Sequence, residues 1–404
     1  MTIPDVPDFT EIPDTPATAR LPWDAADPFS YYEHRGRREG DVVWEHGMRA
    51  WLVLGYQPVQ QILSGAGWTS SPLANANTRD ALRAVNRDIL RSNILFTDGA
   101  DHQRLRDSVR DVFTPAFIAG LHEGVEAIAT ETIDHIPAGV EFDFMAEIAS
   151  PLPIAVVAAW MGLDVGTARL LGDESPAISR MINDVADTGA VEAGTAAFAA
   201  LLAELLPLAA DRRTNHRDDL LRYIAADPDL ELDDVVTTAA IIGVAGHETT
   251  ANLLGAAMIR LLKTRPNGVR PVDTIDTVDD RLVNELRLDG PVQAVARTAT
   301  LDQIVGGVAV HAGEPAIAVI GAANRDPETF SWPNRFQVDR SGPAPLTFGF
   351  GPHYCLGAAL ARLQISVALQ HILARRPVLC GDPTWRDTPT IRGLLCMRAM
   401  FEDD

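Results

Sequence analysis

The chain has 404 residues, of which 47% are hydrophobic and 22% charged, with a formal net charge of −21. Nucleic-acid phosphates and anionic membrane surfaces repel so acidic a chain, so neither is an expected partner. The three cysteines, Cys355, Cys380 and Cys396, are too widely spaced to predict a disulfide framework or a metal-binding pair. We therefore expect a reducing, cytoplasmic environment.

No Gly/Ser-rich linker, repeat or low-complexity tract divides the chain, although its length alone would allow about two or three domains. We predict one large, mainly α domain with a small β-rich region (α+β) over residues 1–404, and a monomer. Residues 1–25 are acidic and proline-rich, are expected to be irregular and do not resemble a signal peptide. The longest apolar stretches fall short of the ~18 residues of a membrane span, so no membrane anchor is expected.

The arginine content reflects the origin of the chain more than its function. Lys263 is the only lysine, so nearly all basic side chains are arginine. A codon bias in a GC-rich bacterial genome explains this more simply than a functional constraint does.

Periodicity and turn residues predict the elements in chain order. Strands and a turn are expected first, then an irregular loop, a long helical region, short strands and a final helix. The predicted segments are strands within Val42–Leu54, a helix at Pro58–Ser64, a partly helical surface loop at Gly67–Asn93, a helix at His102–Phe113, long helices from Phe117 to Leu262, short strands within Leu301–Ile320, irregular chain at Asp326–Pro345, a helix at Leu356–Ala374 and strand-like pieces at Thr390–Met397.

The segment Phe348–Gly357, FGFGPHYCLG, places one cysteine in a glycine-rich loop before an Ala/Leu-rich helical stretch. Glycine lets the backbone approach a flat, bulky ligand and adopt positive φ. A helix start offers free N–H groups and a positive dipole end, which favour a thiolate. A single thiolate held in this way suits the axial position of a haem iron. The alternative is a buried structural cysteine, the usual role of a lone Cys.

This segment resembles the cysteine-loop signature of the cytochrome P-450 family. The resemblance extends from about residue 30 to 400, with further motifs in the expected order. It implies the P-450 fold, haem b (iron protoporphyrin IX) as cofactor and Cys355 as the iron ligand. It also implies that the other residues of the signature contact the haem, namely Phe348, Gly349, His353, Leu356 and Gly357.

A second motif, Ala245–Thr250 (AGHETT), lies inside an apolar helical stretch expected from about Leu232 to Leu262. Buried polar residues are costly without partners, and glycine lowers helix propensity by about 1 kcal/mol relative to Ala. We therefore expect a distorted helix with room for a ligand beside Ala245 and Gly246. The motif resembles the P-450 oxygen-activation motif, which implies proton delivery by Glu248 and Thr249. Alternatively, Thr249 bonds back to the preceding turn and Glu248 faces solvent.

Four cationic or donating side chains suit an anionic ligand. His102 and Arg106 are four residues apart and share a helix face, which suits a carboxylate. The resemblance assigns both residues to the haem propionates, together with Arg297 and His353. A dianionic cofactor needs such groups when it is buried. For His102 and Arg106, the alternative is a solvated basic face.

The segment Val283–Pro291, VNELRLDGP, departs from the family pattern. The family carries Glu three residues before the arginine at Arg287, and this pair joins an arginine of the later meander, best matched by Arg335. The aligned position here is Asn284, and Glu285, two residues from Arg287, is expected to point elsewhere on a helix. A neutral acceptor is weaker than a charged one, so we expect a less rigid structure that Asn284→Glu would stabilise.

The resemblance implies a haem-thiolate monooxygenase that hydroxylates a small molecule with O2 and two electrons. Without a reductase domain in the sequence, the implied donors are a ferredoxin and an NAD(P)H-dependent ferredoxin reductase. An anionic donor would need a basic patch near the cysteine, although isolated solvated arginines are an equal alternative. The candidates for this patch are Arg106, Arg110, Arg362, Arg375 and Arg376.

The pocket residues that family analogy suggests are mostly apolar and favour a lipophilic substrate of open identity. Those named are Ile242, Val244, Ala245, Val292, Val295 and Leu394. Two alternatives to a monooxygenase remain at this point: a peroxide-driven or rearranging haem-thiolate enzyme, and a non-catalytic haem- or ligand-binding protein. The Glu248–Thr249 pair counts against the first, and Asn284 favours the second.

Overall fold

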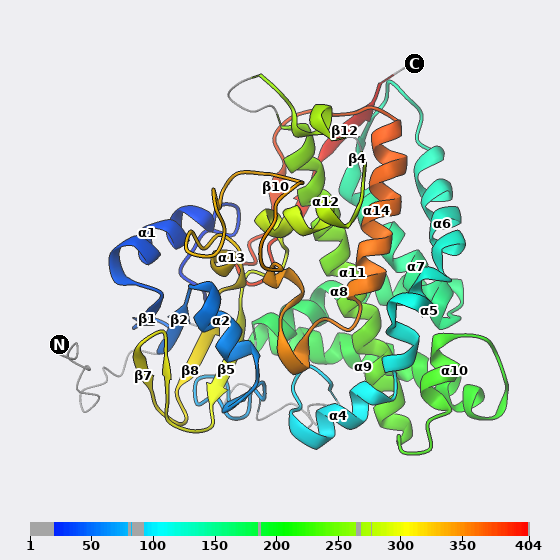
Figure 1. Ribbon diagram of the computed structural model, residues 1–404. Helices are drawn as coiled ribbons and strands as arrows, with labels where there is room; N and C mark the ends of the chain where they lie inside the picture. Colours follow the sequence, from blue (N-terminus) through cyan, green and yellow to red (C-terminus); the bar gives the residue numbers. More distant parts are fainter. Residues whose placement is uncertain are drawn as a thin grey trace.

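The computed structural model of the chain describes residues 20–79, 82, 93–184, 187–263, 268–275 and 277–402. Helices fill most of the molecule, and a small sheet flanked by α1 and α2 lies at one side (Figure 1). The mainly α architecture with small β regions is confirmed. Most of the segment expected to be irregular at residues 1–25, and much of the predicted loop at 67–93, lie outside the described residues.

Thirteen labelled helices are described within these ranges. They are α1 (Phe29–Glu39), α2 (Tyr56–Leu63), α4 (Gly99–Asp107), α5 (Pro115–Ala119), α6 (His122–Asp134), α7 (Pro151–Met161), α8 (Val165–Asn183), α9 (Thr188–Thr214), α10 (Leu220–Ala225), α11 (Leu232–Leu262), α12 (Asp280–Glu285), α13 (Ile320–Ala323) and α14 (Ala358–Ala374). Short 3-10 helices occupy Arg110–Phe113, Pro271–Thr274, Leu286–Asp289, Leu346–Phe348 and Gly351–His353, and Met145–Ala149 forms a π-helical turn.

Side-chain caps fix where several helices begin. Asp164, Asp187 and Asp219 each accept backbone N–H groups at the starts of α8, α9 and α10, and Asp279 does so for α12. Such caps satisfy donors that have no partner inside the helix. Gly162 ends α7 in the left-handed region (φ 68°), which glycine adopts without a steric cost.

The main sheet has five strands in the order β1-β2-β8-β5-β3, and β2 and β8 run parallel. Three smaller sheets have the orders β4-β12-β9, β6-β7 and β10-β11. The strands are β1 (Val42–Glu45), β2 (Ala50–Val53), β3 (Trp68–Thr69), β4 (Glu141–Asp143), β5 (Val295–Ala299), β6 (Gln303–Val305), β7 (Val308–Val310), β8 (Pro315–Ala318), β9 (Pro377–Leu379), β10 (Thr384–Trp385), β11 (Leu394–Cys396) and β12 (Arg398–Phe401).

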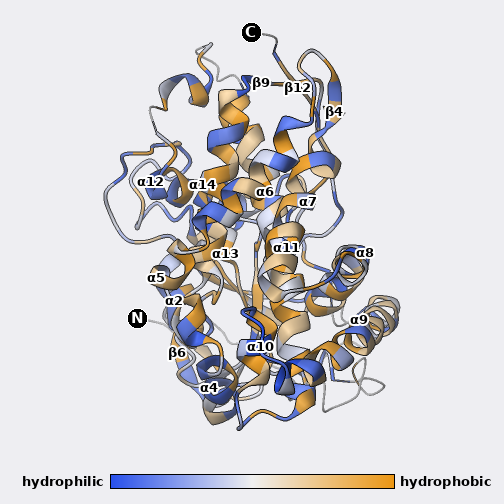
Figure 2. Ribbon diagram, turned by 90° about the vertical axis from the view of Figure 1, so that its right-hand side faces the viewer, coloured by the Kyte–Doolittle hydropathy of each residue, from blue (hydrophilic) through white to orange (hydrophobic). Residues whose placement is uncertain are grey.

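Helix α11 crosses the centre of the molecule between α14 and α8 (Figure 2). Its apolar residues enter two core clusters, one shared with α6 and α14 and one shared with α8 and α9. It begins and ends where the sequence predicts. It is, however, a continuous α-helix through Ala245–Thr250, so the expected distortion is wrong. Gly246 itself is closely packed, since a Cβ built on it would lie 3.3 Å from a Val157 methyl carbon.

Helix α9 is longer and more apolar than the sequence patterns indicated. Within the described residues it is the one helix whose length and mean hydropathy would suffice to cross a membrane. Core helices meet the same criteria, and Phe198, Leu201 and Leu205 of α9 are buried in the cluster shared with α8 and α11.

Candidate active site

The cysteine loop is shaped by its own backbone. The Cys355 N–H donates to Phe348 O at 2.8 Å, and the Tyr354 N–H donates to Gly351 O at 3.0 Å. Gly349 and Gly351 adopt φ of 77° and 71°. A Cβ on Gly351 would lie 3.0 Å from Ser64 Cα and closer still to Leu63 O, at the end of α2. The loop therefore needs glycine at this position, for both conformation and space.

Protein atoms surround the Cys355 thiol, although part of the residue stays accessible. Burial raises the pKa of its thiol, while a hydrogen bond from the Gly357 N–H and the charge of Arg106 lower it. Ala245 is exposed as well, in a stretch of α11 that is otherwise largely buried. Next to Cys355, Leu356 packs against the cluster that contains Val244 of α11. Cys355 and Ala245 are thus both accessible, and Leu356 connects the loop with the core cluster of α11.

The four side chains proposed for an anionic ligand come together. The ring centroids of His102 and His353 are 4.1 Å apart. Burial is the main cause that lowers the pKa of His102, and together with His353 and the charges of Arg106 and Arg297 it brings the value to about 4. Burial also lowers the pKa of Arg297. His102 is therefore neutral near pH 7, and the arginine charges beside it carry a desolvation cost, which an anionic ligand offsets.

Asp98 connects this group to the rest of the site, a role that the sequence patterns did not reveal. Its carboxylate accepts hydrogen bonds from Thr69 Oγ1 at 2.6 Å and from the Ser70 N–H at 2.9 Å, and it pairs with His353 Nε2 at 3.1 Å. These bonds hold the pKa of Asp98 well below its ordinary value, against the effect of burial. The position close to His102 in the sequence was the available signal.

The oxygen-activation motif shows one feature of each interpretation. Thr249 Oγ1 donates to Ala245 O at 2.8 Å, the back-bonded geometry of the alternative. Glu248 is buried rather than solvated, and Arg386 Nη1 lies 2.5 Å from its Oε1. Burial raises the pKa of the Glu248 carboxyl, while hydrogen bonds from Ser179 and Arg386 and the arginine charge oppose the rise. Sequence reasoning missed both partners, which lie far away in the chain.

The predicted pocket residues divide into two groups. Ile242, Val292 and Val295 are partly exposed, as residues that line a pocket would be. Val244 and Leu394 are 2% and 0% exposed and belong to the core clusters, so their assignment to the pocket is wrong. Leu394 packs against α11, where its Cδ1 lies 3.0 Å from a Cβ built on Gly255.

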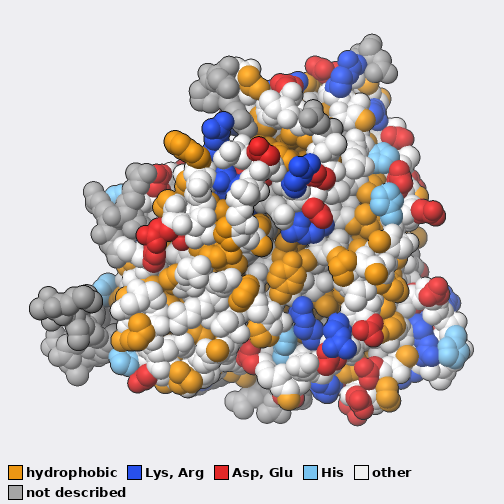
Figure 3. All heavy atoms as spheres, viewed as in Figure 1, with side chains coloured by type: hydrophobic (Ala, Val, Ile, Leu, Met, Phe, Trp, Pro, Cys, Tyr) orange, Lys and Arg blue, Asp and Glu red, His pale blue; other side chains and the backbone are white. Residues whose placement is uncertain are grey.

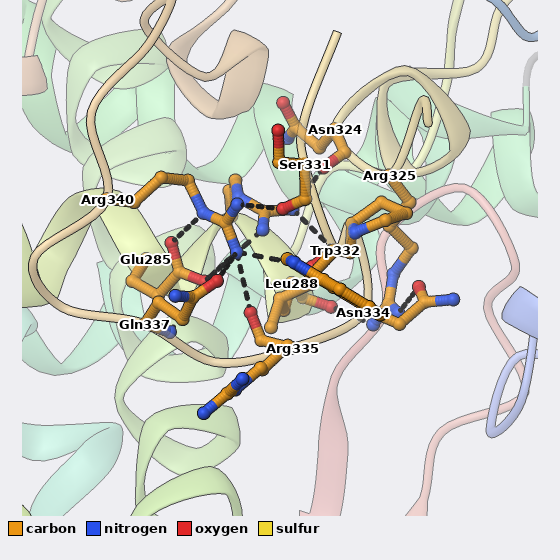
Figure 4. Close-up of polar contacts among 12 residues, drawn as sticks. Glu285, Leu288, Asn324, Arg325, Ser331, Trp332, Asn334, Arg335, Gln337 and Arg340 are labelled. Atoms are coloured by element: carbon orange, nitrogen blue, oxygen red, sulfur yellow. Dashed lines mark hydrogen bonds and ion pairs between the residues drawn. The ribbon is translucent and has the colours of Figure 1, made fainter. Parts of the chain in front are cut away.

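Glu285, not Asn284, forms the predicted charge network, so the expectation for Asn284 and Arg335 is wrong (Figure 4). Arg287 Nη2 lies 3.2 Å from Glu285 Oε1, and Arg340 Nε lies 3.0 Å from Glu285 Oε2. The helix tightens from α12 to a 3-10 helix at Leu286, so the side chains of Glu285 and Arg287 meet although they are two residues apart. Arg335 is exposed and contributes its backbone carbonyl to Arg340.

Asn284 instead faces α14, where its Oδ1 accepts a hydrogen bond from Arg362 Nη2 at 2.7 Å. Asn284→Glu would therefore not add a partner to Arg287, and the stabilisation expected from this change has no structural basis. Glu285 is 2% exposed and has its ionic partners Arg287 and Arg340, so this part of the fold retains an ion-pair network around a buried carboxylate.

The residues present fit a haem group. An accessible single cysteine stands on a loop with glycine at its tight positions, and four donors suited to two carboxylates gather beside it. Together with the helical fold, this defines a haem-thiolate protein.

Comparison with known proteins identifies the family. The cytochrome P450 family model matches residues 280–389. The monooxygenase PikC of Streptomyces venezuelae is 32% identical over 392 residues, covering 92% of this chain and 90% of PikC. The 6-deoxyerythronolide B hydroxylase of Saccharopolyspora erythraea is 30% identical over 366 residues, covering 86% and 89% of the two chains. The ligand-free structure of Mycobacterium smegmatis CYP164A2 matches with a TM-score of 0.82 and 28% identity, over 93% and 96% of the two chains.

The chain belongs to the cytochrome P450 family. It is a P450 monooxygenase, and its cofactor is haem b bound through a cysteine thiolate.

Proposed function

We propose that Cys355 is the iron ligand and that the chain hydroxylates a lipophilic small molecule with electrons from a separate ferredoxin and its NAD(P)H-dependent reductase. The proposal treats residues 1–404 as one catalytic domain, acting as a cytoplasmic monomer. The observation that carries it is that four buried or half-buried side chains able to bind carboxylates, two arginines and two histidines, gather beside an accessible Cys355. When bound, the haem supplies the activation of dioxygen and the insertion of one oxygen atom into a C–H bond.

The chain's own residues bind the cofactor and manage charge. His102, Arg106, Arg297 and His353 would neutralise the two propionates, and Phe348, Gly349, Leu356 and Gly357 would contact the ring. Ala245, which is small and exposed, and the neighbouring Gly246 would lie against the other side of the cofactor. Substrate would be held by the partly exposed apolar residues Ile242, Val292 and Val295.

Glu248 and Thr249 would manage protons on α11. Burial raises the pKa of the Glu248 carboxyl toward neutral pH. A group whose pKa lies near the working pH transfers protons most effectively. Thr249 Oγ1 donates its hydrogen bond to Ala245 O, which holds the hydroxyl in place. The hydroxyl oxygen can still accept a hydrogen bond from a ligand or water.

The face that carries the cysteine loop suits an acidic electron donor. Phe350 and Tyr354 are 38% and 41% exposed, and the space-filling view shows basic side chains on this face near exposed hydrophobic ones (Figure 3). Arg106 donates to Tyr354 O at 2.7 Å, which fixes its charge beside the loop. Arg375 donates to two backbone carbonyls, and Arg110 pairs with Asp107, so these two are weaker candidates.

The first test is the spectrum of the reduced protein with carbon monoxide. We expect the long-wavelength Soret band of a thiolate-bound ferrous carbonyl in the wild type, and loss of this band in Cys355→Ser. A Cys355→Ser protein that retains both band and hydroxylation would overturn the proposal.

The second test separates monooxygenation from the alternatives. With NADPH, reductase and ferredoxin, Thr249→Ala should consume NADPH but form at least about tenfold less product per NADPH. Proton transfer by positioned groups typically contributes about 10²–10⁴-fold to such steps. Unchanged coupling in Thr249→Ala would favour a peroxide-driven or rearranging enzyme. Substrate-induced spectral shifts without any product would favour a binding protein.

A further inference from the structure

Arg362 stands between Asn284 and the start of the cysteine loop. It lies in the first turn and a half of α14, and its Nη2 donates to Asn284 Oδ1 at 2.7 Å. Its guanidinium carbon lies 4.9 Å from the centroid of the Phe348 ring. The carbonyl of Phe348 in turn accepts the backbone N–H of Cys355 at 2.8 Å. One path of contacts thus runs from α12 through Arg362 to Cys355.

The charge of Arg362 is poorly compensated. Its main anchor is a neutral amide, and the nearest carboxylate, Asp280 Oδ1, lies 3.5 Å from Nη1. The Asp280 side chain is 76% exposed, whereas that of Arg362 is 22% exposed. An exposed carboxylate is screened by water and holds its partner weakly. Most of the positive field therefore remains on the side of the Phe348 ring, where a cation over a ring face is attracted by the ring's quadrupole.

We propose that Asn284 and Arg362 are positioning residues that raise the reduction potential of the Cys355-bound haem: the neutral amide holds the guanidinium against Phe348 without cancelling its charge. The inference rests on the proposed role of Cys355 as iron ligand. One-electron reduction adds a negative charge to the site, and a nearby half-buried cation stabilises that charge more than it would in open water. Asn284, which takes no part in the Glu285 network, thus acts on the electron-accepting step.

The sharpest test is Asn284→Asp, because this change replaces one amide nitrogen by oxygen and preserves side-chain size. The new carboxylate would pair with Arg362 and cancel its field. We expect the midpoint potential of the substrate-free holoenzyme, measured by spectroelectrochemical titration, to fall by about 30 mV or more. This corresponds to about a threefold change in the electron-transfer equilibrium, at about 59 mV per tenfold for one electron.

Two changes at Arg362 give independent readings. Arg362→Gln removes the charge but can still bond Asn284, and it should lower the potential at least as far as Asn284→Asp does. Arg362→Lys keeps the charge but loses the planar group that stacks on Phe348, and it should recover part of the lost potential. Asp280→Asn is the matched control: it removes an exposed carboxylate beside Arg362, and its potential should stay close to that of the wild type.

The ferrous–carbonyl band keeps this inference separate from the function itself. If the wild type lacks the thiolate band, the proposed role of Cys355 fails. If every variant shows the band and the potentials of Asn284→Asp and Arg362→Gln equal that of the wild type, the role of Cys355 stands and this inference is overturned. An equal fall of the midpoint potential in Asp280→Asn and Asn284→Asp would also overturn it, since the neutral Asn284 amide would then have no specific effect on the haem.

Discussion

The cysteine loop and the middle of α11 both carry predicted site residues, but they are held in place by different forces. The loop is fixed by backbone hydrogen bonds such as Cys355 N–H to Phe348 O, and by glycine at Gly351. On α11, Glu248 is fixed by side chains from distant segments, Ser179 and Arg386. A backbone-determined loop is encoded in a few consecutive residues, whereas a charge-determined position depends on partners that only the folded chain brings together.

The largest effect is expected where the backbone leaves no room. Gly351→Ala places a Cβ against Leu63 O and Ser64 Cα at a φ of 71°. Backbone strain and overpacking together should cost about 3–5 kcal/mol and displace the cysteine. We expect a lower unfolding temperature and loss of the ferrous–carbonyl thiolate band.

Gly313→Ala is the control for this change. Gly313 also has positive φ, 89°, but a Cβ added there would meet no atom within 4 Å. The variant should lose only the roughly 1 kcal/mol of the left-handed conformation and keep the band. Equal losses in the two variants would show that steric contact at α2 is not what holds the loop.

The buried charge network should give the next largest effect. Arg340→Gln removes one partner of Glu285, whose side chain is 3% exposed, and should cost about 3 kcal/mol in the free energy of unfolding. Arg335→Gln changes an exposed side chain and should stay within about 0.5 kcal/mol of the wild type. Chemical denaturation of the two variants measures the difference. A larger loss of unfolding free energy in Arg335→Gln than in Arg340→Gln would contradict the observed pairing of Arg340 with Glu285.

Sequence reasoning predicted the features that local sequence determines and missed those that depend on partners distant in the chain. The bounds of α11 and the shared helix face of His102 and Arg106 were predictable from periodicity and short spacings, whereas Arg297 and His353 were assigned through the family resemblance. Arg340 and Arg386 were not predictable, since they pair with residues 55 and 138 positions away. Glu285 was missed because regular α-helical geometry was assumed, whereas the chain tightens to a 3-10 helix at Leu286. The buried positions of Val244 and Leu394 depend on tertiary packing, which periodicity does not fix.

The smallest effect on stability, and the most specific, is expected at Arg386. Burial raises the pKa of Glu248, and Arg386 limits that rise, so Arg386→Gln should raise the pKa further. A carboxyl whose pKa is higher in the folded than in the unfolded protein stabilises the fold fully at pH below its unfolded pKa. That contribution is lost as pH rises through the folded pKa. The stability of Arg386→Gln relative to the wild type should therefore fall as pH rises above the ordinary glutamate value of 4.5.

The measurement is the unfolding temperature of the wild type and of Arg386→Gln from about pH 5 to 9. His247 is the other titratable group close to Glu248. His247 is buried next to Glu248 in the chain, and burial with the charge of Arg386 lowers its pKa to about 4, so it stays neutral over this range. Glu248→Gln in the Arg386→Gln background should abolish the extra pH dependence, because no ionisable carboxyl then remains at this position. If the extra dependence survives in the double variant, it arises elsewhere. In that case Arg386 does not control the charge of Glu248, and the middle of α11 would resemble the cysteine loop in being set by its own backbone.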